Sequence, residues 1–336
     1  MTDRTKAETL ESDQEKQIST QITTQNQQLC FLVPCYNESE NINFLYAKLT
    51  EVRNEIYKTY DLESKVLFID DGSSDGTWDL IVKLNKKDPS VNGLKLSRNF
   101  GKENALLAGY ENAPKSDFYL SLDADMQDDP GVVGRMVEQS QKGYHIVYAQ
   151  RASRKDTYIY ILCTQIFYGI MRMGTKVKFP PNVSDFHIIT EKVRQSFLQM
   201  QESVRYTRGL VFYTGHSNIG VTYDRPERNA GTGKFNFMKL VVFMLDAVTS
   251  FTTLPVHLIG VIGMIFSVVS FIFGLFYVAI SIFTKSAIPG WASMMSASLF
   301  LGSVQIMMTA VLAEYISRIS QEVKHRPKYF LDEVIK

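Results

Sequence analysis

Three short segments in the first half of the chain place carboxylates beside turn-forming residues. They are PCYNE at 34–38, DDGSSDG at 70–76 and DADMQDD at 123–129. Adjacent carboxylates repel one another and stay ionised only in water or beside a cation. An Asp-x-Asp pair such as Asp123 and Asp125 offers two oxygen ligands with which a hard divalent ion can bridge to phosphate oxygens. The spacing therefore predicts a Mg²⁺ or Mn²⁺ site for a nucleotide. For each cluster taken alone, the alternative is an Asx turn that begins a helix.

Each acidic segment directly follows a short apolar run. The runs that predict strands are 29–33, 66–69, 94–96, 118–122 and 146–148. Apolar residues recur at helical spacing from Ile42 to Ile56, Ser74 or Asp75 can cap a second helix, and Asp129 can begin a later one. Alternating strands and helices predict an α/β domain with a mostly parallel sheet covered on both faces. Because ligands of such sheets bind beyond the carboxyl ends of the strands, we expect the acids to meet there.

Composition and motifs exclude several classes of protein. The chain has 336 residues, and its 36 Lys+Arg nearly cancel its 35 Asp+Glu, so we expect no nucleic-acid partner. With 20 Gly, 10 Pro and 3 Cys it is neither collagen-like nor a disulfide scaffold. The cysteines are odd in number and show no C-x-x-C spacing, which indicates a reduced, cytosol-facing compartment. The glycine-rich phosphate-binding motifs are absent. Any nucleotide must therefore be held by acids and a metal ion.

The apolar residues are concentrated near the end of the chain. No charged side chain occurs between His257 and Lys285, or between Lys285 and Glu314. Each run exceeds the ~20 residues that cross a bilayer, which predicts a hairpin of two transmembrane helices in 256–316. The alternative is a pair of buried helices in a large soluble core. The tail at 317–336 is basic, whereas the turn of the hairpin carries only Lys285, so both termini and the catalytic domain are predicted to be cytoplasmic.

Three further segments complete the predicted organisation. Residues 1–28 are polar, without the apolar core of a signal peptide, and we expect a disordered tail. An uncharged aromatic stretch predicts an interfacial helix near 156–173, and Arg151 and Arg154 just before it are placed to bind a lipid phosphate. The alternative for these arginines is a solvated charge run. Residues 236–254 predict a juxtamembrane amphipathic helix.

Together the motifs resemble those of inverting glycosyltransferases with the GT-A fold. More narrowly, they are similar to polyprenyl-phosphate sugar transferases, relatives of dolichol-phosphate mannose synthase that include two-helix bacterial glucosyl transferases. The motifs are FLVP with YNE at 31–38, DDGS with DGT at 70–77, SRNFGKE at 97–103 and DADMQD at 123–128, followed by the hairpin. The resemblance implies a GT-A domain at 29–235, a nucleotide-sugar donor, a membrane polyprenyl phosphate acceptor and Mg²⁺ or Mn²⁺.

The resemblance also implies roles for individual residues. The nucleoside would be held by Pro34, Tyr36, Glu38 and Asp71, with Asp70 beside them. The metal would be bound by Asp123, Asp125 and Gln127. The departing diphosphate would be bound by Arg228 and Lys234 of a mobile loop. Asp185 aligns with an Asp-Phe pair placed near the acceptor and often assigned as the base. A helix cap before residue 190 is its alternative. The chain departs from the family at His187, where arginine is common, and at Gly233, where serine is usual.

These observations predict an enzyme that transfers glucose or N-acetylglucosamine from its UDP derivative to undecaprenyl phosphate, with inversion. A lipid phosphate is already largely ionised at pH 7, so no strong base is required. A processive polysaccharide synthase is one alternative, although the segment 201–206 lacks the Gln-x-x-Arg-Trp motif of those enzymes. A non-catalytic nucleotide-binding scaffold is the other. Arg205 and Arg208 are expected to pair with Glu202, and small residues in the hairpin favour a homo-oligomer.

Overall fold

The computed structural model of the chain describes residues 27–125, 129–151, 180, 183–202, 206–223 and 290–336, together with 261, 263, 265, 269 and 272. Within these residues an eight-stranded sheet has the order β7-β5-β6-β4-β1-β2-β3-β8. The strands are β1 (Gln28–Cys35), β2 (Glu63–Asp70), β3 (Val91–Leu96), β4 (Phe118–Ser121), β5 (Ile146–Arg151), β6 (Val183–Thr190), β7 (Asn218–Tyr223) and β8 (Leu331–Ile335). The five strands predicted from apolar runs are all confirmed.

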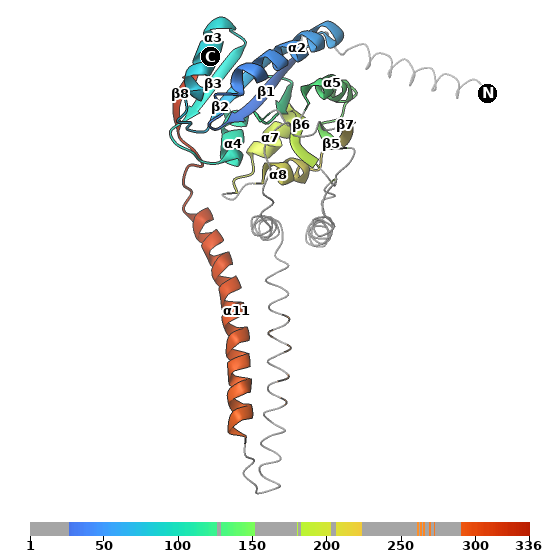
Figure 1. Cartoon of the computed structure of the whole chain (residues 1–336). Coiled ribbons are helices and arrows are strands. Elements are labelled where there is room, and N and C mark those ends of the chain that lie inside the picture. The colour runs from blue at the N-terminus through green and yellow to red at the C-terminus, as the bar shows by residue number, and fades with distance from the viewer. Residues whose placement is uncertain are drawn as a thin grey trace, which may run out of the picture.

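Helices cover both faces of this sheet (Figure 1). The described helices are α2 (Ile42–Tyr60), α3 (Thr77–Lys87), α4 (Lys102–Asn112), α5 (Val133–Gln141), α7 (Glu191–Leu198), α8 (Thr207–Tyr213) and α11 (Trp291–Val323), with a 3₁₀ turn at Pro130–Val132. Helices α2, α3 and α5 pack on one face, and α4, α7 and α8 on the other. Helix α2 and the turn that begins at Asp129 agree with the sequence analysis, whereas the N-cap of α3 is Gly76 and neither Ser74 nor Asp75.

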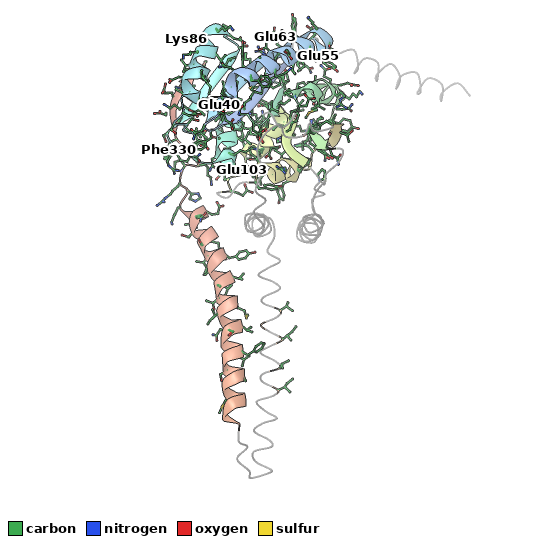
Figure 2. The ribbon with its side chains drawn as sticks, in the orientation of Figure 1. Glu40, Glu55, Glu63, Lys86, Glu103 and Phe330 are labelled. Carbon is green, nitrogen blue, oxygen red and sulfur yellow. The ribbon has the colours of Figure 1, made fainter. Side chains whose placement is uncertain are left out.

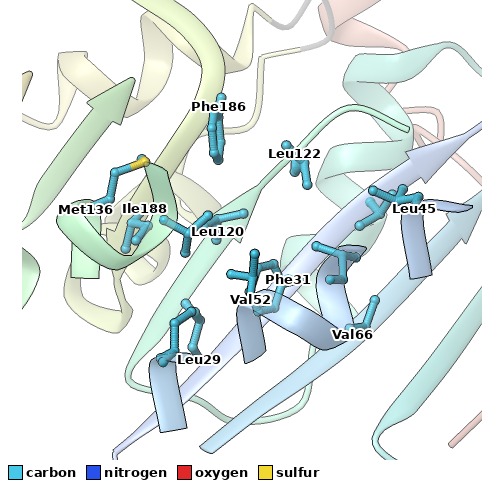
Figure 3. Packing of buried hydrophobic residues seen from close by; sticks show 14 of the residues in the cluster. Leu29, Phe31, Leu45, Val52, Val66, Leu120, Leu122, Met136, Phe186 and Ile188 are labelled. Carbon is cyan, nitrogen blue, oxygen red and sulfur yellow. The ribbon is translucent and has the colours of Figure 1, made fainter. Parts of the chain in front are cut away.

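The strand residues divide between two apolar layers, which explains their continuous apolar runs. Leu29, Phe31 and Val33 join the cluster beneath α2, whereas Cys30 and Leu32 join the cluster beneath α4. Figure 3 shows the first cluster, where side chains from several strands and helices interdigitate. Because successive strand residues point to opposite faces, a strand covered on both sides carries no polar alternation. Packing in these two apolar clusters fixes the positions of the strands. The strand ends, which carry the candidate site, are therefore fixed as well.

The sheet is mixed, and most of the strand pairs among the described residues are parallel, as predicted. Strands β1, β2, β3 and β4 are parallel neighbours, and β5 and β7 are parallel to each other. Strand β6 lies antiparallel between β4 and β5, and β8 is antiparallel to β3. Asp185 belongs to β6 and does not cap a helix, so the helix-cap alternative is wrong.

The end of the chain forms part of the fold. We expected residues 317–336 to be a basic tail, but α11 continues to Val323 and Leu331–Ile335 form β8 at the edge of the sheet. Figure 1 shows α11 projecting from the domain and the chain end beside β3. Among the described residues, Phe300–Val323 is the one helix long and apolar enough to cross a membrane.

Several predicted features lie outside the described residues. They are the tail at 1–26, the interfacial helix near 156–173, the juxtamembrane helix at 236–254 and most of the first predicted span. Gln28, assigned by the sequence analysis to the tail, is the first residue of β1.

Candidate active site

A pocket of about 310 Å³ lies at the carboxyl edge of the central strands. Its lining residues are Pro34, Cys35, Tyr36, Glu38, Asp71, Asn99, Gly101, Lys102, Ala105, Asp123, Ala124 and Asp125. Six of the predicted site residues are therefore brought together: Pro34, Tyr36, Glu38, Asp71, Asp123 and Asp125. They come from the ends of β1, β2 and β4, as expected for a parallel sheet.

The loops after β1 and β2 hold each other in place. The Asn37 backbone adopts φ 54°, and its side-chain oxygen accepts a 2.9 Å hydrogen bond from the Ser74 amide. Asp75 accepts hydrogen bonds from the amides of Ser39 and Thr77, each at 3.1 Å. Burial opposes its charge, but the hydrogen bond from the Thr77 hydroxyl, together with these amides, lowers the pKa of Asp75 to about 2. The rim of the pocket is thus fixed by backbone donors, which is one way of preorganising a binding site.

Asp70 and Asp71 are adjacent but have different surroundings. Asp71 lines the pocket and accepts hydrogen bonds from the amides of Phe100 at 2.7 Å and Gly101 at 2.9 Å. Asp70 is fully buried, and its Oδ1 accepts a 3.0 Å bond from the Ser73 amide. Burial raises the pKa of both carboxyl groups. Asp71 therefore lies where a ligand can reach it, whereas Asp70 supports the loop from behind.

Gly72 allows the loops after β2 and β3 to touch. Its φ is +69°, and a Cβ atom there would lie 2.4 Å from the carbonyl carbon of Arg98. Only glycine adopts this conformation without strain and leaves room for such an approach. The close approach brings the amides at 100–101 within reach of Asp71.

The register between β4 and β6 brings two acids face to face. Ser121 pairs with His187 in this antiparallel register. Asp123, two residues after Ser121, therefore comes opposite Asp185, two residues before His187. Like charges directly opposite destabilise a sheet. The Lys102 ammonium lies between them, with Nζ 2.7 Å from Asp123 Oδ1 and 2.7 Å from Asp185 Oδ2. Burial disfavours its charge, but Asp185 and Asp123 raise the pKa of Lys102 above its ordinary value.

Arg208 on α8 contacts the other oxygen of Asp185. Its Nε donates to Asp185 Oδ1 at 2.9 Å, which corrects the expectation that Arg208 pairs with Glu202. Although burial opposes ionisation, Arg208 and Lys102 hold the pKa of Asp185 well below its usual range. A carboxylate with so low a pKa is a weak base. The geometry therefore favours a positioning role for Asp185.

Lys102 and Arg208 are the site residues that the sequence analysis missed. Lys102 is the first residue of α4 and belongs to the SRNFGKE motif at 97–103, which was noted without a role for the lysine. This motif directly follows the predicted strand at 94–96, so it was expected at the same edge of the sheet as the three acidic segments. A lysine in that position was the signal for a cation near the acids. Its neighbour Glu103 accepts a 2.8 Å hydrogen bond from the Thr207 amide and so attaches α4 to the start of α8.

His187 lies behind the site. It is 1% exposed, and its Nε2 is 3.0 Å from the hydroxyl of Tyr110 on α4. Burial lowers the pKa of His187 to about 4, so the ring is neutral at pH 7. The residue at which the chain departs from the family pattern therefore contributes to the core beneath Asp185 and does not line the pocket.

The pocket offers a divalent ion two carboxylates. Asp123 and Asp125 both line it, and Gln127, the third predicted ligand, lies outside the described residues. Among the residues described, no group of three His, Cys, Asp or Glu side chains is arranged to bind a metal alone. Mg²⁺ is commonly held by one or two carboxylates together with waters and substrate phosphates. The donor set therefore fits an ion that arrives with a phosphate ligand.

The remaining predicted residues are placed less completely. Arg151 is the last residue of β5, and its strand ends at the same edge as β4, because both are antiparallel to β6. Arg154, Arg228 and Lys234 lie outside the described residues. Figure 2 shows Glu103, the neighbour of Lys102, on the side of the domain toward α11, with Glu55, Glu63 and Lys86 at the other end. The start of α4, which carries Lys102 next to Glu103, is therefore on the side of the domain toward α11.

Comparisons with known proteins agree with this geometry. Residues 30–196 match the family described as glycosyl transferase family 2, and residues 255–319 match the GtrB C-terminal hairpin. An uncharacterized glycosyltransferase of Synechocystis is 35% identical over 91% of this chain and 95% of its own length. A prophage bactoprenol glucosyl transferase homolog of Escherichia coli is 35% identical over 92% and 99%. A bactoprenol glucosyl transferase of Shigella phage SfV is 34% identical over 90% and 97%.

Proposed function

Because the chain belongs to glycosyl transferase family 2, with a mixed α/β GT-A-like sheet, we propose that it transfers glucose from UDP-glucose to undecaprenyl phosphate. UDP-N-acetylglucosamine is the second candidate donor. The product would be a lipid-linked sugar for glycosylation of the cell envelope. One observation carries the proposal: an acid-rich pocket at the strand ends belongs to a chain whose helix α11 is long and apolar enough to cross a bilayer. The bactoprenol glucosyl transferases among its relatives support the choice of sugar and lipid.

The donor would occupy the pocket described above. Tyr36 is 47% exposed at its rim, where an aromatic ring can stack on a nucleobase. Glu38 and Asp71 supply acceptors for nucleoside hydroxyl and imino groups. Asp71 is held in place by the amides at 100–101 and needs no rearrangement to accept such a bond.

Asp123 and Asp125 would hold the donor diphosphate through Mg²⁺ or Mn²⁺, with Gln127 as the predicted third ligand. When bound, the ion supplies positive charge to the departing diphosphate. Lys102 already lies against Asp123 and can shield the same charge from the other side. Arg228 and Lys234 are proposed to add to this shielding from their loop.

The acceptor phosphate would approach on the side of Asp185. Its oxygen is already anionic, so the residues there must orient it and reduce repulsion from the donor. Asp185 holds Lys102 and Arg208 in place by ion pairs, and these two cations would attract an anionic headgroup that enters there. Arg151 and Arg154 are proposed to bind that headgroup. In-line attack at the anomeric carbon gives inversion of configuration.

We also propose two membrane spans, cytoplasmic termini and a homo-oligomer. The match to the GtrB hairpin and the apolar helix α11 support membrane association. The chain end in β8 belongs to the same sheet as the pocket, so the residues after α11 lie on the side of the catalytic domain. Protease protection in inverted vesicles tests this topology: an accessible tag after residue 336 is expected.

The decisive test is transfer of radiolabelled sugar from UDP-glucose into a chloroform-extractable lipid, in membranes supplied with undecaprenyl phosphate. Label in the lipid, lost on omission of divalent metal, is the expected result. Label in a polymer would favour a processive synthase, and absence of transfer from every nucleotide-sugar would favour a non-catalytic scaffold.

A further inference from the structure

The residues that follow α11 bind back onto the catalytic domain. We call 328–335 the C-terminal strap; it ends in β8, which pairs antiparallel with β3. The pairs include Gly93 with Ile335 and Leu94 with Val334, and a Cβ atom at Gly93 would lie 2.9 Å from the Ile335 side chain. The strand thus packs too closely on β3 to be a loosely attached tail.

Lys328 and Tyr329 of the strap attach to two separate parts of the domain, residue Gln201 and the end of α4. Lys328 Nζ donates to the carbonyl oxygen of Gln201 at 3.1 Å. The Tyr329 hydroxyl accepts from Asn112 Nδ2 at 2.9 Å and donates to Glu111 at the end of α4. These contacts fix the segment between α11 and β8 across the face that carries α4.

Phe330 contacts the loop that forms one wall of the donor pocket. Its carbonyl oxygen accepts a 2.9 Å hydrogen bond from the Ser97 amide, and its ring centroid lies 6.1 Å from that of Phe100. Phe100 also contacts Arg98, whose guanidinium carbon is 4.0 Å from the ring centre. Figure 2 shows Phe330 at the end of the domain nearest to α11. Phe100 therefore contacts both a strap residue and a residue of its own loop.

The same loop positions the acid of the pocket. The amide of Phe100 donates to Asp71, and Asn99, Gly101 and Lys102 line the pocket directly. Burial of Asp71 makes each of its hydrogen bonds important, because an unpaired buried carboxylate oxygen is costly. A continuous series of contacts thus runs from the residues after α11 through Phe330 and Phe100 to Asp71.

From these contacts we propose that Phe330 and Tyr329 are positioning residues for the donor pocket. They hold the loop at 97–101 in the conformation that binds a nucleoside diphosphate. The strap contacts this loop at both Ser97 and Phe100, so without Phe330 the loop samples conformations that release Asp71. Donor affinity therefore depends on the segment that joins the catalytic domain to the apolar helix. The role in donor binding rests on the proposed function, whereas the ordering of the loop does not.

The test compares Phe330→Ala with Val334→Ala in the full chain, purified in detergent. Val334 is a matched control because it lies on the same strap, is 45% exposed, and pairs with Leu94 away from the loop. Hydrogen exchange of peptides covering 97–103 is measured first, without any ligand. We expect exchange about fivefold faster in Phe330→Ala and unchanged in Val334→Ala, the effect of losing one aromatic pair.

UDP affinity by calorimetry, in buffer containing Mn²⁺, is the second measurement. Phe330→Ala should raise the dissociation constant about fivefold, and Tyr329→Phe about twofold, with the rate at saturating donor nearly unchanged. Equal exchange in Phe330→Ala and Val334→Ala would overturn the proposal. Faster exchange with no UDP binding even by the unaltered protein would confirm the positioning of the loop and count against the proposed function instead. Phe330→Leu, which retains an apolar side chain, should recover part of both effects.

Discussion

The two ends of the sheet both carry charged pockets, but the charges are balanced at one end and not at the other. At the amino ends of the strands, a pocket of about 390 Å³ is lined by Arg53, Lys65, Glu63 and Asp88 among its charged residues. Two cations there face two anions. The smaller pocket at the carboxyl ends, about 310 Å³, is lined by four carboxylates and Lys102, a formal excess of three negative charges.

The difference extends to how each acid is satisfied. Asp88 accepts hydrogen bonds from Ser90 N at 2.9 Å, Tyr46 Oη at 3.0 Å and Arg53 Nη1 at 3.0 Å. All of its bonding capacity is used within the protein, which identifies a structural cluster. The pocket at the carboxyl ends instead has more carboxylates than cations among its lining residues. Such an excess is stabilised by a bound cation, so charge imbalance locates the candidate site better than pocket size does.

The largest effect should come from Asp125→Asn, which removes one of the two carboxylates available to a metal. We expect sugar transfer to fall about a thousandfold, equivalent to about 4 kcal/mol of transition-state stabilisation. Initial rates of label incorporation into lipid measure it. Asp88→Asn, at the other end of the sheet, is the control and should transfer at the normal rate. Full activity of the unaltered protein after chelation of divalent ions would contradict the metal role.

Lys102→Met should have the next largest effect. Without the ammonium, Asp123 and Asp185 face each other across β4 and β6 with no cation between them. We expect transfer to fall about a hundredfold, because both acids move from their positions. Lys102→Arg should recover a part of the rate, since it restores the charge in a different shape. Equal loss in both variants would mean that the length of the side chain matters and not its charge.

The free energy of unfolding should depend on pH through different groups at the two ends of the sheet, His187 at the carboxyl end and Asp88 at the amino end. His187 has a folded pKa of about 4, below the unfolded value of about 6.5, so the unfolded state binds more protons between these values. The free energy of unfolding should therefore fall by up to about 3 kcal/mol as the pH drops from 6.5 to 4. Asp88, whose pKa hydrogen bonds lower to about 2 against the effect of burial, retains its contribution until the pH falls below about 4.

His187→Gln is the variant that isolates this effect, because glutamine can still bond to the Tyr110 hydroxyl but does not titrate. Chemical denaturation at pH 7 and pH 5 should show a smaller difference in the variant than in the unaltered protein. An identical pH dependence in both proteins would show that His187 is not the titrating group.

The smallest effect on activity should come from Arg53→Met at the amino ends of the strands. Its guanidinium bonds to Asp88, Ser90 and the Ser64 carbonyl, so its loss leaves several acceptors unpaired. We expect about 2 kcal/mol lower stability by denaturation and an unchanged rate of transfer. A tenfold loss of transfer with unchanged stability would reverse the comparison and assign a catalytic function to this cluster.

The sequence predicted most of the elements that form the donor side of the site. The runs at 29–33, 66–69 and 118–122 are apolar enough to require burial on both faces, and a parallel arrangement necessarily brings the segments after them to one edge. The strands β6, β7 and β8 were not predicted. In β6, the polar residues Ser184, Asp185 and His187 interrupt the apolar pattern. The partners of Asp185 and His187 come from α8 and α4, which are distant in the sequence.

The sequence by itself determined which acids occur at strand ends, because strand length and hydrophobic burial are local properties. Only the tertiary structure decided that Asp185 lies opposite Asp123, since that register depends on a strand inserted between β4 and β5. It also decided that Lys102 bridges these two acids and that the end of the chain returns to β3. Pairing between distant segments is fixed by the packing of the whole domain, and no local pattern of residues encodes it.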